Sequence, residues 1–140
     1  MTNLKINHLA AITCIVLLHV LGFLWYGPLF GEKWMDMVGI DMQAMEANPP
    51  GAGLWITNFI ACAAPVYLFA WLFTQLNVTT GIRGAAIVFI VTLCVHHLPV
   101  MSGNMFADEP YGFAWITGGF SLVAFSLSGF ILGAWTKTKA

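Results

Sequence analysis

The sequence predicts an all-α integral membrane protein, a four-helix bundle with a short amphipathic helix lying at the membrane surface in its first outer loop. The composition is the first reason, because 59% of the 140 residues are hydrophobic and only 8% are charged, whereas a soluble domain has about 25% charged residues. The second reason is a mean hydropathy of +0.83. The third is that four apolar stretches each approach the roughly 20 residues that a bilayer-crossing helix needs.

The four predicted spans belong to a single membrane domain, residues 1–140. They cover residues 8–27, 54–76, 82–101 and 113–135. We expect helices and no strands, because each segment in lipid must satisfy its own backbone hydrogen bonds. The first span is expected to stay in the protein, since its apolar region is longer than that of a signal peptide and no small-residue cleavage site precedes Trp25.

The basic residues gather on one side of the predicted membrane. They lie before the first span, between the second and third spans, and after the fourth: Lys5, Arg83, Lys137 and Lys139. The other side has Lys33 together with all six acidic residues. Because loops rich in lysine and arginine stay in the cytoplasm, we expect an inner-membrane protein with both termini cytoplasmic.

The long first outer loop, residues 28–53, has a pattern of its own. Its apolar residues recur at near-helical spacing and predict an interfacial helix over residues 30–46: Phe30, Trp34, Met37, Val38, Met42 and Met45. Pro28 is expected to end the first span, because proline lacks the N–H donor that a continuing helix uses. Aromatic side chains are enriched at head-group depth, which predicts four interfacial anchors: Trp25, Tyr26, Trp34 and Trp55.

Two stretches resemble a known family. "LGFLWYGPLFGEKWM", residues 21–35, resembles the N-terminal signature of the domain-of-unknown-function family 1761, and "GFILGAW", residues 129–135, resembles its last helix. The resemblance covers nearly the whole chain. It implies a small bacterial four-helix membrane protein with no assigned reaction, and it supplies no catalytic residues.

Polar residues inside lipid are costly and therefore informative. His19 and His96 both lie in the outer halves of outward-running helices, and Asn58 lies near the outer start of the second span. The helical face that His96 shares with Thr92 predicts that His96 points inward. His97 is then expected to reach the interface or a neighbouring backbone carbonyl.

Three uses of these histidines are compatible with the sequence. His19 and His96, with Cys94 or a methionine joining in, could bind haem or a soft metal such as copper. They could instead relay protons or hold an anionic head group. The simplest interpretation is that each imidazole hydrogen-bonds a neighbouring helix and fixes its packing. No cofactor is therefore predicted, and haem and copper are the alternatives.

Other features restrict the function. The sequence contains no pattern typical of a nucleophile with its base or of a phosphate loop, and a net charge of −1 provides no basic footprint for nucleic acid. Gly129 and Gly133 form a small-xxx-small pair, which favours close packing inside the chain over a homodimer contact. We expect a non-enzymatic structural or assembly component of an oligomer or membrane complex. The alternative is a protein that binds a small molecule, a metal or haem around His19 and His96.

Overall fold

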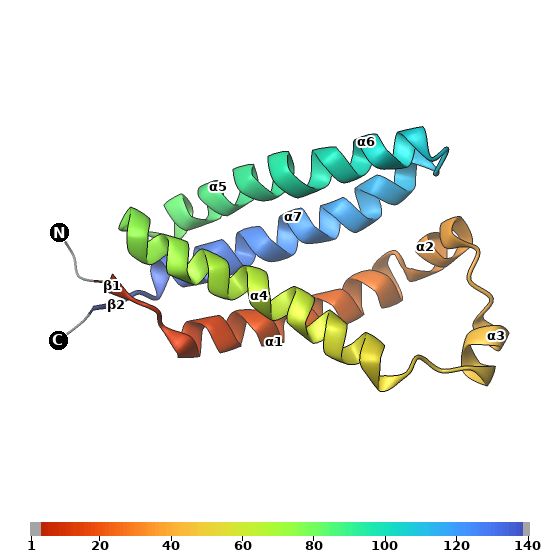
Figure 1. The fold of residues 1–140 in the computed structure, drawn as a ribbon, viewed down its shortest axis with the longest axis horizontal. Helices are drawn as coiled ribbons and strands as arrows, with labels where there is room; N and C mark the ends of the chain where they lie inside the picture. The colour runs from red at the N-terminus through yellow and green to blue at the C-terminus, as the bar shows by residue number, and fades with distance from the viewer. Residues whose placement is uncertain (1–3, 139–140) are drawn as a thin grey trace.

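The computed structural model describes residues 4–138, except for the side chains of Met42 and Ala44; Lys139 lies outside this range. Four helical stretches of the described chain are long and apolar enough to cross a membrane: His8–Leu29, Ala52–Leu76, Gly81–Phe106 and Tyr111–Ala134. The predicted all-α membrane bundle is confirmed. The first and last described residues lie at one end of the elongated bundle, here named the inner end, and the opposite end is the outer end (Figure 1).

The spans are built from five α-helices and two π-helical turns. The helices are α1 (His8–Leu24), α4 (Ala52–Leu76), α5 (Gly81–Thr92), α6 (Leu98–Phe106) and α7 (Tyr111–Ala134). The π-helical turn η1 (Trp25–Leu29) extends α1, and η2 (Leu93–His97) joins α5 to α6. Each π-helical turn is associated with a proline. Pro28 lies inside η1, and Pro99 lies two residues after the end of η2. A missing proline N–H disturbs the regular ladder of hydrogen bonds, and π-helical turns are one result.

The third span and α7 make the most extensive helix contact of the bundle, and they run antiparallel along its length (Figure 1). Glycines make this approach possible. A Cβ atom added to Gly84 would overlap the carbonyl oxygen of Gly129, and one added to Gly133 would overlap that of Thr80. The small-xxx-small pair of α7 therefore packs inside the chain, against α5.

The core lies between α1, α7 and the inner half of α4. Cys14 of α1 is fully buried there, and its Sγ lies 3.7 Å from the carbonyl oxygen of Ser128. Phe69 of α4 packs on Phe125 of α7 with ring centroids 6.4 Å apart. Residues 52–61 differ, because every one of them is exposed. This outer half of α4 diverges from α5 and α7 (Figure 1).

The first outer loop contains two short helices where the sequence predicted one. The chain kinks at Gly27, whose φ and ψ are both −106°, so the first span ends close to the predicted Pro28. Next comes α2 (Gly31–Val38), which ends at Gly39 in the left-handed region, with φ at 69°. A third short helix, α3 (Met42–Ala47), follows. Glycine adopts positive φ without strain, and this position divides the predicted segment.

Two short strands at the inner end were not predicted. β1 (Leu4–Lys5) pairs antiparallel with β2 (Lys137–Thr138). Both strands lie beyond the spans, so the expectation of helices within lipid is not affected by them. Asn7 reinforces the junction, since its Nδ2 donates to the carbonyl oxygen of Trp135 at 2.9 Å while its Oδ1 accepts from the N–H of Ala10 at 3.4 Å.

Candidate functional site

The histidine pair of the third span is oriented opposite to the prediction. His97 is buried, with 1% of its surface exposed, whereas His96 is exposed. The cause is η2, in which the N–H of Leu98 donates to the carbonyl of Leu93, five residues back. The buried face of α5 includes Thr92. A regular α-helix would continue that face three or four residues later, and the extra residue of the π-helical turn brings His97 there instead.

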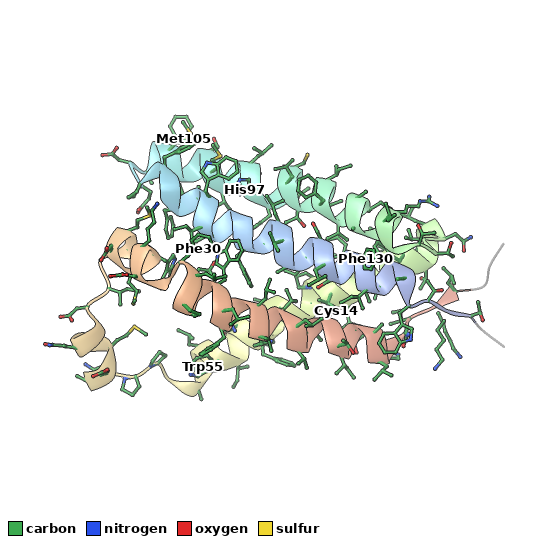
Figure 2. The ribbon with its side chains drawn as sticks, turned by 180° about the vertical axis from the view of Figure 1, so that it is seen from behind. Cys14, Phe30, Trp55, His97, Met105 and Phe130 are labelled. Atoms are coloured by element: carbon green, nitrogen blue, oxygen red, sulfur yellow. The ribbon has the colours of Figure 1, made fainter. Side chains whose placement is uncertain are left out.

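His97 packs against α7 without a polar partner. Its ring lies over Gly118, where an added Cβ would overlap the imidazole, and its centroid lies 5.0 Å from that of Trp115. Figure 2 shows the side chain between the third span and α7. Neither ring nitrogen has a hydrogen-bond partner in the described part of the chain. The expected contact with a backbone carbonyl is therefore absent from this region.

His96 makes the polar contact between the third span and α7. Its Nε2 lies 3.3 Å from Oγ of Ser121. The Ser121 hydroxyl also lies 3.4 Å from the carbonyl oxygen of Thr117, within its own helix. Cys94, two residues before His96, is exposed. This arrangement joins two helices by one hydrogen bond, which matches the simplest of the three interpretations of His96.

His19 lies in a different setting, on α1. Its Nδ1 lies 2.8 Å from the carbonyl oxygen of Ile15. A carbonyl only accepts, so Nδ1 carries the proton, and in a neutral imidazole Nε2 is then a free acceptor. The ring also lies 5.9 Å from the ring of Phe59, on α4.

His19 and Asn58 line one groove between α1 and the outer half of α4. This outer groove has a volume of about 580 Å³. Its polar or aromatic lining residues are His19, Phe23, Tyr26, Trp55, Asn58, Cys62 and Phe120. The sequence reasoning missed Tyr26 and Cys62 as part of this site. The spacing held a signal for Cys62, because it follows Asn58 by four residues and shares its helical face. His96 is not among the residues that line this outer groove. The groove therefore does not bring His19 and His96 together, and a site shared by the two histidines stays a hypothesis.

Metal ligands do not gather anywhere in residues 4–138 as described, since no group of three or more His, Cys, Asp or Glu side chains could hold an ion. The outer groove offers one imidazole, one thiol, one amide and one phenol. These groups suit a small molecule with mixed polar and apolar character.

The four predicted anchors make different contacts. Trp25 turns towards α7, where its Nε1 donates to the carbonyl oxygen of Ile116 at 2.9 Å. Tyr26 packs edge-on against Trp34, with centroids 5.3 Å apart. Trp55 is 62% exposed and lies on the outer half of α4 (Figure 2). Their depth at the membrane surface stays a prediction, and the structure adds that Trp25 also joins two helices.

These features define a helical membrane protein with four candidate spans. A family model described as "Protein of unknown function (DUF1761)" matches residues 9–133. The chain belongs to this family, as its sequence signature suggested. A UPF0591 membrane protein of Schizosaccharomyces pombe is 28% identical over 95 residues. That match covers 65% of this chain and 64% of the relative, so the chain spans less than two thirds of that protein. No solved structure matches the chain.

Proposed function

We propose that this protein is a non-enzymatic component of the bacterial inner membrane that assembles with a second copy of itself through the outer half of α4. One observation carries the proposal. Asn58 places an exposed amide on an otherwise strongly apolar helix surface, and it has no hydrogen-bond partner among the described residues. An unpaired amide in lipid costs free energy, and asparagine is one of the residues that join membrane helices.

The surface around Asn58 is open to a partner helix. Trp55, Asn58 and Cys62 follow one another on one face of α4 and all line the outer groove. The inner half of α4 is already occupied, because Val66 and Phe73 are buried in the bundle. The outer half is the part of α4 in which every residue from 52 to 61 is exposed, so it offers a second helix the most open surface.

A second copy is the occupant that suits this chemistry. In a two-fold dimer a residue that lies on the symmetry axis meets its own copy in the partner, and we place Asn58 there. An asparagine amide both donates and accepts, so two Asn58 side chains would satisfy each other. Membrane hydrogen bonds contribute about 0.6–2 kcal/mol each. One such bond corresponds to roughly 3- to 30-fold in association.

The test is energy transfer between donor- and acceptor-labelled copies of the full chain in liposomes, across a range of protein-to-lipid ratios. We expect transfer above random co-occupancy for the natural chain, loss of it in Asn58→Leu, and retention in Asn58→Gln, which keeps the amide. Thr57→Val is the matched control, because Thr57 is exposed on a neighbouring face and does not line the groove. Random-level transfer by the natural chain, or unchanged transfer in Asn58→Leu, would contradict the proposal.

A second candidate function is binding of a small molecule in the outer groove. The observation that favours it is the free Nε2 acceptor of His19 in a groove that also holds Asn58. Haem or copper held with His96 is the metal form of this idea. An absorption spectrum and a metal analysis of purified protein test it, since a Soret band or stoichiometric copper that disappears in His19→Leu would favour binding over assembly.

A further inference from the structure

The strand pairing at the inner end places two like charges opposite each other. Lys5 of β1 is the direct partner of Lys137 of β2 in the antiparallel register. Directly opposite residues project to the same face with Cβ atoms about 5 Å apart, and like charges there are destabilising. Both side chains are exposed. The pairing therefore gathers positive charge at the inner end.

The acidic residues lie elsewhere. All six belong to the connections at the outer end: Glu32, Asp36, Asp41, Glu46, Asp108 and Glu109. Figure 1 shows those connections, around α2, α3 and the α6–α7 turn, at the opposite end of the bundle from β1 and β2. Among the described residues, no acidic side chain therefore lies at the inner end to compensate the two lysines.

A groove joins the two lysines to the membrane-facing surface. This terminal groove has a volume of about 510 Å³, and its lining includes Lys5, Lys137, Asn7, His8, Leu9 and Trp71. Its polar part surrounds the start of α1, whose first N–H groups carry partial positive charge. The exposed apolar residues of its lining are Leu9 and Trp71, which are 59% and 51% exposed.

We propose that the terminal groove binds the head group of an anionic phospholipid. The two lysine ammonium groups contact the phosphate oxygens, and the start of α1 adds the partial positive charge of its helix dipole. Leu9 and Trp71 contact the first part of the acyl chains, because they lie on the bilayer-crossing surfaces of α1 and α4 next to the lysines. The phosphate also removes the repulsion between Lys5 and Lys137, so the lipid fastens the two ends of the chain together.

The apolar side of the groove favours a lipid over free phosphate. A soluble anion such as phosphate would contact the lysines but would make no apolar contact with Leu9 and Trp71. Anionic lipids are also concentrated in the cytoplasmic leaflet, which the inner end faces in the proposed orientation. Juxtamembrane lysines each contribute to such binding, and two of them together correspond to roughly 30-fold in affinity.

The experiment measures thermal unfolding of the full chain in mild detergent with added phosphatidylglycerol, phosphatidylcholine or inorganic phosphate. We expect a rise in melting temperature with phosphatidylglycerol alone. The double variant Lys5→Gln, Lys137→Gln should bind phosphatidylglycerol roughly 30-fold more weakly. Without lipid, that variant should melt at the same or a higher temperature than the natural chain, because the like charges are gone.

Two further variants keep the test decisive. Arg83→Gln is the matched control, since Arg83 is basic and near the inner end but does not line the groove; its lipid response should equal that of the natural chain. Lys5→Arg with Lys137→Arg keeps the charge and should keep the response, which covers the case in which the glutamine variant fails to fold. An equal rise with phosphatidylcholine, an equal rise with inorganic phosphate, or an unchanged response in the glutamine variant would each overturn the proposal.

Discussion

The imidazole of His97 lies directly over the backbone of Gly118, at a point where α7 has no side chain. The third span and α7 meet at other glycines too, Gly84 and Gly129, nearer the inner end. His97 thus serves as the outer contact of the same helix pair. Its ring is fully enclosed and Trp115 packs beside it, so we interpret His97 as a packing residue and not as part of a binding site.

The first prediction concerns Gly118. Its replacement by alanine places a methyl group where the His97 ring lies, which forces the third span away from α7. Overpacking of this kind costs about 1–3 kcal/mol, and the better helix propensity of alanine offsets about 1 kcal/mol of it. We expect Gly118→Ala to lower the free energy of unfolding and the melting temperature in detergent micelles.

Gly119 provides the matched control for that measurement. A Cβ added there would lie 3.5 Å from the Trp25 ring, an ordinary packing distance. Gly119→Ala should therefore leave the melting temperature unchanged or raise it slightly. Equal melting temperatures for the two variants would mean that the His97–Gly118 contact does not fix the helix pair.

The second prediction tests the hydrogen bond from Trp25 to α7. Trp25→Phe removes the donor to the Ile116 carbonyl while keeping an aromatic ring. The loss of one such bond costs about 0.5–1.5 kcal/mol, and we expect a corresponding fall in the free energy of unfolding in micelles. Trp55→Phe is the comparison, because Trp55 is mostly exposed and should show almost no change. A larger effect at Trp55 would contradict the assignment of Trp25 as a helix-joining residue.

The third prediction concerns Asn7, which both caps α1 and joins it to the end of α7. Loss of a helix cap costs about 1 kcal/mol, and the bond to Trp135 is lost as well. Asn7→Ala should lower the melting temperature and speed amide hydrogen exchange in β1 and β2. Thr13→Ala serves as the control, since the Thr13 hydroxyl bonds only Leu9 of its own helix. Unchanged exchange in the strands would show that the pairing holds without Asn7.

The sequence was sufficient for the spans because span formation depends on local composition. Twenty apolar residues satisfy their own backbone in lipid wherever they stand. The observed spans begin and end within five residues of the predicted bounds. The largest difference is at the end of the third span, which is Phe106 instead of the predicted residue 101.

The orientation of His96 and His97 could not be read from helical spacing. The one extra residue in η2 rotates the side chains that follow it about the helix axis. Arguments from residue spacing assume a regular α-helix and miss this rotation. Pro99 was a visible signal, but Pro65 lies inside α4 without producing a π-helical turn. Proline alone therefore does not predict the shift. The pairing of Lys5 with Lys137 was hidden for another reason, because two-residue strands that are more than 130 positions apart leave no local pattern.

The last prediction is topological, and the strand pairing sharpens it. Leu4 and Thr138 are partners in the ladder, so these two residues lie on one side of the membrane and the number of spans between them must be even. We expect single cysteines introduced as Met45→Cys and Thr138→Cys to react from opposite sides. The background is a variant without Cys14, Cys62 and Cys94.

The measurement uses a membrane-impermeant maleimide on intact spheroplasts and on permeabilised ones. Met45→Cys, in α3 at the outer end, should react in both, and Thr138→Cys only after permeabilisation, because the basic inner end faces the cytoplasm. Arg83→Cys is the internal control and should behave as Thr138→Cys, since the turn between α4 and α5 lies at the same end (Figure 1). If Thr138→Cys reacted in intact spheroplasts and Met45→Cys only after permeabilisation, the four-span fold would stand and its orientation would be the reverse of the one expected. Reaction of Met45→Cys and Thr138→Cys from the same side would contradict the four-span fold itself.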